Sequence, residues 1–255
     1  MDIKTEFAPG DDGGVIATVM VDHPAKLNVL DQDRALRLAA ALRAVATRED
    51  LRVCVLRGAG DRALIGGADI EFMANVNPDG AEAFITSIHD ACDAIRRMPV
   101  PVIARMAGHC HGAGLEIAAA CDLRIADENT VIGMPEVQVG LPSVIEAALL
   151  PRLIGWGRTS YLVYTGKMVD AKTGYDWGMF EQLAKPGQLD EILEQTVKAV
   201  AQAGPQTIRL QKELCRDWEE LPMRDAIQRG IEIMPRAFAT GESQDRMRAF
   251  MNRKR

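Results

Sequence analysis

The feature that most constrains the fold is a glycine-rich junction, AGHCHGAGLEIAAACD, at residues 107–122. The residues before it, 100–104, are apolar and favour a buried strand, whereas the small apolar residues from Gly112 onward favour a tightly packed helix. The glycines therefore fall where a strand turns into a helix. Glycines allow a ligand or another backbone to approach closely, and the first turn of a helix presents free N–H groups.

This junction predicts an anion-binding site with a carboxylate beside it. Glu116 lies one turn into the expected helix, next to donors that can stabilise a developing oxyanion. The alternative is a close-packed helix start with a solvated glutamate, and the spacing taken alone favours that alternative.

Composition limits the class of protein. With 255 residues and 47% hydrophobic content, the chain can bury one large core, or one domain with a helical appendage. A net charge of −6 argues against nucleic-acid binding through bulk charge, although the chain ends in RKR. The five cysteines form no CxxC pair, which is typical of reduced core residues. No run reaches the ~18 apolar residues that span a bilayer, and residues 1–6 are not a signal peptide, so we expect a cytoplasmic protein without a membrane segment.

The N-terminal part predicts a β-hairpin, a helix and a further strand. Residues 3–7 and 15–21 flank a glycine-rich turn, and the second segment alternates as a strand does. Asp31 can cap the helix that follows, and we expect residues 51–56 to form a strand. The apolar face expected on the helix consists of Leu36, Leu38, Leu42 and Val45.

The segment GAGDRA at residues 58–63 matches the dinucleotide-binding pattern GxGxxA. That pattern must open a continuous helix, whereas Gly66 and Gly67 follow closely and no helical periodicity starts before about Gly80. We therefore reject a dinucleotide site. Residues 63–70 instead predict a second glycine-lined turn whose N–H groups can face a ligand, although many Gly-Gly pairs are simply turns.

A second acid follows further along the chain. Residues 79–97 show helical spacing, and residues 123–126 favour a short strand. Glu136 comes directly after Pro135 at the end of another extended segment, so we place it on a loop. Loops after strands often carry chemistry in α/β scaffolds, but ordinary surface acids lie there too.

From residue 143 the pattern is mainly helical. The expected helices cover residues 143–153, 157–164, 170–178, 189–202, 205–218, 222–239 and a last one from about 243. We divide the chain into a core at residues 1–190 and a C-terminal helical region at residues 191–255. The apolar faces of this region exceed what its own chain can cover, so we expect a homo-oligomer.

Six motifs make the chain resemble the crotonase family, the enoyl-CoA hydratases and isomerases, over essentially its full length. They are KLNVL (26–30), the segment 53–70 ending in GADI, PVPVIA (99–104), GAGLE with CD (112–116 and 121–122), GMPEV (133–137) and PRLIG (151–155). The resemblance implies an α/β fold with a crotonase-like β-β-α spiral core and a C-terminal helical oligomerisation region. Members usually form trimers that pair into hexamers.

The resemblance also implies roles for the glycine turns and the glutamates. The N–H groups of Ala68 and Ala113 would form an oxyanion hole for a thioester carbonyl. Ala113 replaces the glycine usual at that position, and it can serve because only its backbone N–H is used. Glu136 would deliver a proton to the α-carbon and Glu116 would activate water, so the pair indicates an enoyl-CoA hydratase that makes a 3-hydroxyacyl-CoA. Isomerase members generally keep one of the two acids.

Coenzyme A is part of the substrate in this family, and the resemblance implies no separate cofactor. The resemblance also implies a set of residues that bind the substrate and its coenzyme A part: Lys26, Asn28, Leu30, Gly67, Asp69, Ile70, Gly112, Gly114, Pro142, Phe250 and Lys254. Phe250 and Lys254 would come from a neighbouring subunit. The sequence contains no spacing typical of metal ligands.

Several alternatives stay open. Isomerase and acyl-CoA hydrolase activities use the same oxyanion hole. The non-enzymatic alternatives are a catalytically silent scaffold and an RNA-binding member; the paired glutamates argue against the first and the acidic charge against the second. His109 and His111 adjoin the hole, and we favour a packing role for them over a catalytic one.

The sequence departs from the family in one loop. After Gly140 most relatives carry a glycine-rich run, whereas this chain has SVIEAALL at residues 143–150. The loop approaches the acyl end of the substrate in the family, which makes Glu146 a candidate third acid. The alternative, which we favour, is that Ser143 and Glu146 form a capping box at a helix start.

Overall fold

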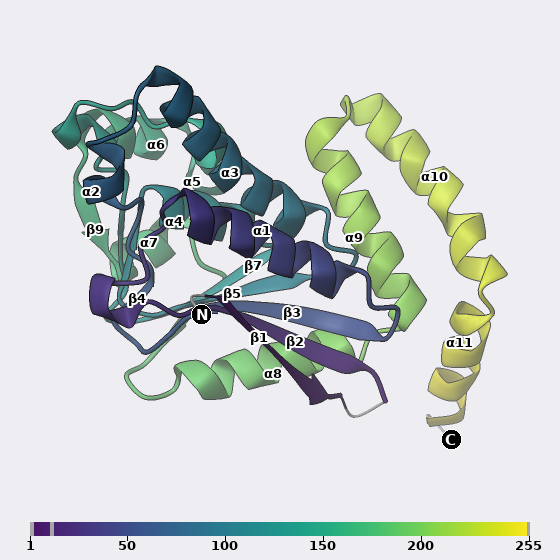
Figure 1. The fold of residues 1–255 in the computed structure, drawn as a ribbon. Coiled ribbons are helices and arrows are strands. Elements are labelled where there is room, and N and C mark those ends of the chain that lie inside the picture. Colours follow the sequence, from purple (N-terminus) through teal and green to yellow (C-terminus); the bar gives the residue numbers. More distant parts are fainter. Residues whose placement is uncertain (1–2, 11–12, 254–255) are drawn as a thin grey trace.

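The computed structural model describes residues 3–10 and 13–253 of the chain. Within these residues the larger sheet has six strands in the order β1-β2-β3-β5-β7-β10 (Figure 1). They span Ile3–Pro9 (β1), Val15–Val21 (β2), Leu51–Gly58 (β3), Val102–Met106 (β5), Leu123–Asp127 (β7) and Gln182–Ala184 (β10). The β1–β2 hairpin is antiparallel and the other neighbours are parallel. The expected hairpin and the expected strands at residues 51–56 and 123–126 are therefore confirmed.

Helices cover both faces of this sheet. Alternate side chains of β3 point to opposite faces, so Cys54 and Leu56 join the main core, whereas Val53 and Val55 join a second cluster. The helices on the main-core face include α1 (Gln32–Ala46) and α3 (Pro78–Arg96), while α8 (Leu189–Ala201) lies on the other face (Figure 1). Burial on both faces explains why the middle of β3, residues 53–56, is entirely apolar.

The cap predicted for α1 is confirmed, because the Asp31 side chain accepts the N–H of Arg34. The predicted apolar face is wrong at one position. Leu36 is 47% exposed, and the large buried residues of the helix are Leu38, Leu42 and Val45. Leu36 is only two residues from Leu38, which places it on a different side of a helix with a 3.6-residue period.

A smaller sheet turns the chain into a spiral. Within the described ranges it has four strands in the order β4-β6-β8-β9. They span Ala63–Ile65 (β4), His109–His111 (β6), Val131–Gly133 (β8) and Met168–Asp170 (β9). β3 leads into β4, β5 into β6, and β7 into β8; α3 follows the first pair and α4 (Ala113–Ala120) follows the second. This is the expected β-β-α spiral core, and the β3–β4 connection holds no helix of the dinucleotide-binding kind.

The remaining elements of the body are short. They are η1 (Pro24–Lys26), α2 (Ile70–Met73), η2 (Glu136–Val139), η3 (Ile145–Leu149), α5 (Leu150–Ile154), α6 (Trp156–Thr165) and α7 (Ala171–Trp177). Two predictions are corrected here. The helix expected at residues 143–153 is instead a 3-10 turn followed by a short α-helix, and Glu136 opens a 3-10 helix rather than lying on an open loop.

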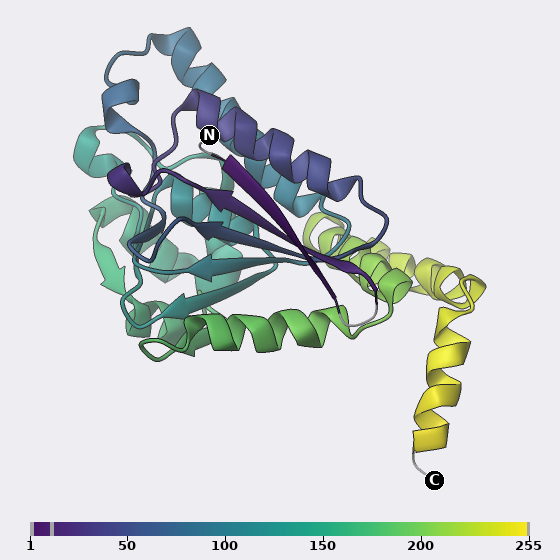
Figure 2. The ribbon, with the colours of Figure 1, turned by 60° about the horizontal axis from the view of Figure 1, so that its bottom comes forward.

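The chain ends in a helical arm made of α9 (Pro205–Glu220), α10 (Met223–Ala239) and α11 (Glu242–Arg253). Lys212 of α9 ties the arm to the body, because its Nζ lies 2.6 Å from Oδ1 of Asp122. α10 and α11 then lead away from the sheets (Figure 2). The expected boundary at residue 190 falls inside α8, which packs on the sheet and so belongs with the body. Over the described residues, no helix is both long and apolar enough to cross a membrane.

Candidate active site

The glycine-rich junction is a sharp turn from β6 into α4. Gly112 has φ 50° and ψ −120°, a conformation that side chains with a Cβ rarely adopt. A Cβ at this position would lie 2.3 Å from Oε1 of Glu136, so glycine also leaves room for that carboxyl. The junction therefore brings the second acid of the sequence to the N-terminus of α4.

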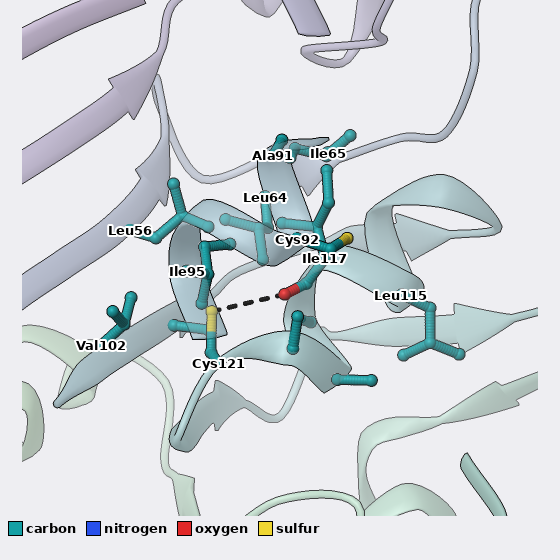
Figure 3. Packing of buried hydrophobic residues seen from close by; sticks show 14 of the residues in the cluster. Leu56, Leu64, Ile65, Ala91, Cys92, Ile95, Val102, Leu115, Ile117 and Cys121 are labelled. Carbon is teal, nitrogen blue, oxygen red and sulfur yellow. Dashed lines mark hydrogen bonds between the residues drawn. The ribbon is translucent and has the colours of Figure 1, made fainter. Parts of the chain in front are cut away.

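α4 is buried along its whole length. All residues from Ala113 to Ala120 are buried, and the neighbouring side chains come from β3, β4, α3 and β5 (Figure 3). At the far end of the helix the thiol of Cys121 donates to the carbonyl of Ile117 across 3.4 Å (Figure 3). A helix packed on all sides holds the groups of its first turn in fixed positions.

The second glycine-lined turn lies directly against the first. A Cβ at Gly114 would be 2.0 Å from the carbonyl oxygen of Ile65, and one at Gly67 would be 3.3 Å from that of His111. Only residues without a side chain allow such close contact between the end of β4 and the start of α4. The two turns that the sequence singled out separately are thus neighbours in the fold.

A backbone pairing orients the turn at Ala68. Leu30 and Ala68 form a parallel bridge, in which the N–H of Leu30 donates to Gly67 O at 2.9 Å and that of Asp69 donates to Leu30 O at 2.8 Å. Neither Ala68 nor Ala113 donates its N–H to a backbone or side-chain acceptor in residues 3–10 and 13–253. Two free N–H donors on adjacent turns, one at a helix N-terminus, can stabilise an oxyanion.

Glu116 is the buried acid of the site, with 4% of the residue exposed. Burial, and after it the charge of the neighbouring Glu136 carboxyl, raise the pKa of the Glu116 carboxyl to about 8. The N–H of Ala147 donates to Oε1 of Glu116 at 3.2 Å and opposes this shift. A carboxyl with this pKa holds its proton at neutral pH and can both give and take a proton.

Glu136 faces the same space from η2. Burial raises the pKa of its carboxyl, whereas the hydroxyl of Ser143, which donates to Oε2 at 2.9 Å, lowers it. Because the charge of Glu136 acts on Glu116, the two carboxyls titrate as a coupled pair. The sequence predicted both acids but missed this role of Ser143.

The predicted capping box is wrong. Ser143 bonds to Glu136, and the residue that precedes η3 is Val144, which makes no side-chain cap. Glu146 is a buried residue, 7% exposed, and its Oε1 lies 2.8 Å from Nδ1 of His89 on α3. No local pattern pointed to His89, because its partner is 57 residues away along the chain.

Residues expected to meet coenzyme A line the edge next to the second turn. Lys26 is half exposed, and its Nζ lies 2.8 Å from Oε2 of Glu71 and 3.6 Å from Oδ2 of Asp69. Ile70 is 55% exposed beside it. Asn28 is buried and its Nδ2 donates to the carbonyls of Ala59 and Ala63, at 3.2 and 2.9 Å, so it fixes the loop. Leu30 is also fully buried, so neither of these two side chains is exposed to a ligand.

The other expected contacts are spread over the molecule. Pro142 lines an apolar pocket of about 500 Å³ together with Val144, Trp156 and Tyr164. Phe250 is 60% exposed on α11, at the end of the arm and away from the junction (Figure 2). Lys254 lies outside the described residues.

Comparison with known proteins identifies the family of this chain. A family model described as "Enoyl-CoA hydratase/isomerase" matches residues 11–255. The chain belongs to the enoyl-CoA hydratase/isomerase family. It is an enzyme of this family, and the resemblance and the fold class inferred from the sequence are both confirmed.

Relatives and solved structures of this family match nearly the whole chain. A crotonyl-CoA hydratase of Syntrophomonas wolfei is 28% identical over 241 residues, which are 94% of this chain and 93% of that protein. An (E)-benzylidenesuccinyl-CoA hydratase of Thauera aromatica is 30% identical, with 83% of each chain covered. The crystal structure of an enoyl-CoA hydratase from Bacillus anthracis has a TM-score of 0.93 at 25% identity and covers 99% of this chain and 97% of its own.

The two histidines of the junction point to each other. Nδ1 of His109 lies 3.3 Å from Nε2 of His111, and the rings pack edge to face. Burial, with the added charge of His109, lowers the pKa of His111 to about 4. Among the described residues, neither ring forms a hydrogen bond with Glu116 or Glu136, which is consistent with the packing role favoured from the sequence.

Proposed function

We propose that this enzyme is an enoyl-CoA hydratase, which adds water across the double bond of a 2-enoyl-CoA to give a 3-hydroxyacyl-CoA. The observation that carries the proposal is the meeting of two coupled carboxyls, Glu116 and Glu136, at the N-terminus of α4. Ala68 and Ala113 present free N–H groups beside them. This combination provides two proton-transfer groups and an oxyanion site in one place.

The oxyanion site acts on the thioester carbonyl. Attack of water at the β-carbon moves an electron pair to the carbonyl oxygen, and the N–H groups of Ala68 and Ala113 would donate to that oxygen. They are fixed before the substrate arrives, by the Leu30–Ala68 bridge and by the packing of α4. Donors that need no reorganisation stabilise the developing charge most effectively.

The carboxyl pair would balance the protons. One carboxylate takes a proton from water as the new C–O bond forms, and the other carboxyl gives a proton to the α-carbon of the enolate. We assign the first role to Glu116 and the second to Glu136, as the family resemblance implies. Because the pKa of Glu116 is about 8, the free enzyme keeps one proton on the pair, mainly on Glu116. Hydration starts when that proton lies on Glu136 and Glu116 is ionised. Dehydration, the reverse reaction, starts when the proton lies on Glu116 and Glu136 is ionised.

The proposal includes a second copy of the chain. The side of α10 left uncovered by the rest of the chain carries Met223, Ile227, Ile231, Met234 and Phe238, each between 46% and 77% exposed. An apolar stripe of this length is typical of a subunit interface. A homo-oligomer would also bring a neighbour's Phe250 and Lys254 toward the coenzyme A edge at Lys26. The proposed reaction needs no separate cofactor.

A panel of acyl-CoA thioesters tests the proposal. We expect loss of the enoyl absorbance without release of free thiol, and we expect Glu116→Gln and Glu136→Gln each to lower turnover about a hundredfold or more with thioester binding little changed. Free thiol would indicate an acyl-CoA hydrolase instead. A wild-type product with a moved double bond, together with loss of activity in Glu136→Gln but not in Glu116→Gln, would indicate an isomerase.

A further inference from the structure

A partly buried contact beside the carboxyl pair is not used by the proposed reaction. It joins His89 of α3 to Glu146 of η3, whose side chains are 53% and 9% exposed. Oε2 of Glu146 is buried and has no hydrogen-bond partner among the residues described. A buried carboxyl oxygen without a hydrogen-bond partner destabilises the fold, so we expect Glu146 to have a function that offsets this cost.

The residue before Glu146 is strained. Ile145 has φ 38°, in the left-handed region that favours glycine. A β-branched side chain crowds the backbone there more than most, and such a conformation persists only where the surroundings hold it. The hydrogen bond between His89 Nδ1 and Glu146 Oε1 ties this turn to α3, a long helix packed in the core.

The residue after Glu146 contacts the catalytic pair. The N–H of Ala147 is shared between Val144 O at 3.0 Å and Oε1 of Glu116 at 3.2 Å. The strained turn therefore has one anchor on α3 and presents its next amide to Glu116. The position of that amide depends on the turn staying closed.

We propose that His89 and Glu146 form a clamp that holds the strained turn at Ile145 closed, so that the Ala147 N–H stays on Glu116. Glu146 and His89 are then positioning residues for the acid that handles the water proton. The proposal rests on the proposed function for the role of Glu116, but the clamp itself can be tested without turnover.

The clamp has two opposite electrostatic effects on Glu116. The titratable groups that face this carboxyl are Glu136 from η2, Glu146 from η3 and the thiol of Cys92 from α3, whose own pKa is raised by burial. The Ala147 amide lowers the pKa of Glu116, whereas the carboxyl of Glu146 raises it. Breaking the clamp and neutralising Glu146 should therefore move this pKa in opposite directions.

The first experiment compares His89→Ala with Glu146→Gln in the full-length enzyme. His89→Ala frees the turn, so we expect kcat to fall about tenfold with KM nearly unchanged, and the alkaline limb of the pH profile to move to higher pH. Glu146→Gln keeps an oxygen that accepts from His89, so we expect kcat to change little and the alkaline limb to move to lower pH. Asp90→Ala is the matched control, because Asp90 is the next residue of α3 and bonds to Arg43 of α1 instead.

The second experiment removes the strain. Glycine adopts φ 38° freely, so Ile145→Gly relieves the turn of its tendency to open. We expect Ile145→Gly to restore most of the kcat lost in His89→Ala. A double variant no faster than His89→Ala, or pH limbs that move in the same direction in His89→Ala and Glu146→Gln, would overturn the clamp.

A titration without substrate separates the clamp from the reaction. With ¹³C-labelled glutamate carboxyls, the signal lost in Glu116→Gln identifies Glu116, and its pKa can be followed in each variant by NMR. If the pKa of Glu116 moves in opposite directions in His89→Ala and Glu146→Gln, but the wild-type enzyme does not hydrate thioesters, the clamp is supported and the proposed function is rejected. Unshifted titrations in an active hydratase would reject the clamp alone.

Discussion

The hydroxyl of Ser143 donates to Oε2 of Glu136 at 2.9 Å, which links the divergent loop of this chain to one of its two acids. This bond lowers the pKa of Glu136 against the larger effect of burial. Its loss should therefore raise that pKa. We expect Ser143→Ala to move the acid limb of kcat/KM to higher pH and to lower kcat about tenfold or less.

Ser143→Thr is the matched variant for this prediction, because it keeps a hydroxyl at the same position. It should retain the wild-type acid limb. If Ser143→Ala and Ser143→Thr share one pH profile, the bond to Glu136 has no part in catalysis.

Burial of Glu116 should make the stability of the protein depend on pH. The folded-state pKa of about 8 lies above the unfolded value of 4.5, so the stability due to this group is complete below pH 4.5 and is lost as pH rises through about 8. Glutamine carries no charge to bury. We expect Glu116→Gln to melt a few degrees above wild type at pH values above 8, and the difference to vanish in acid. A pH-independent difference in melting temperature would show that Glu116 does not titrate in this range.

Gly112 should be needed for the position of Glu136. An alanine Cβ would lie 2.3 Å from Oε1 of Glu136, so Gly112→Ala should displace this carboxyl and lower kcat about tenfold to a hundredfold. Gly155→Ala is the control, because Gly155 also has positive φ, 81°, but a Cβ there would meet nothing within 4 Å. Its activity should stay near wild type although the backbone strain is similar. Equal losses in both variants would point to general destabilisation.

The local patterns of the sequence predicted much of the fold. Apolar alternation predicted β2, and the segment 51–56 predicted β3. The glycines at 66–67 and 112–114 predicted two turns that the structure places in contact. Glu116 and Glu136 were found because each follows such a local signal. These features depend on residues close in the sequence, where periodicity and steric rules apply directly.

The parts that could not be predicted depend on contacts between distant residues. The Ser143–Glu146 spacing matches a capping box, but Glu136 and His89 offer these side chains partners that the local pattern does not contain. α8 was assigned to the tail from its position in the chain, whereas its side chains Leu189 and Val197 complete the core under β3. In both cases contacts between distant residues, rather than the local sequence pattern, determine where the side chains lie.

The apolar stripe of α10 should hold subunits together. Ile231 is 62% exposed near its middle, so Ile231→Glu should lower the molar mass measured by light scattering at micromolar concentration. Arg224→Glu, at an exposed polar position of the same helix, is the control and should leave the mass unchanged. A wild-type protein that is already monomeric would reject the homo-oligomer.

The central claim is that Glu116 and Glu136 direct water to the β-carbon of an enoyl thioester. The most direct measurement is turnover of a short 2-enoyl-CoA in ¹⁸O-labelled water, followed by mass spectrometry of the product. The account predicts an intact thioester that carries the label on its 3-hydroxyl group, with the rate reduced about a hundredfold or more in Glu116→Gln. Label in a free carboxylate, or an unlabelled product with a shifted double bond, would contradict it.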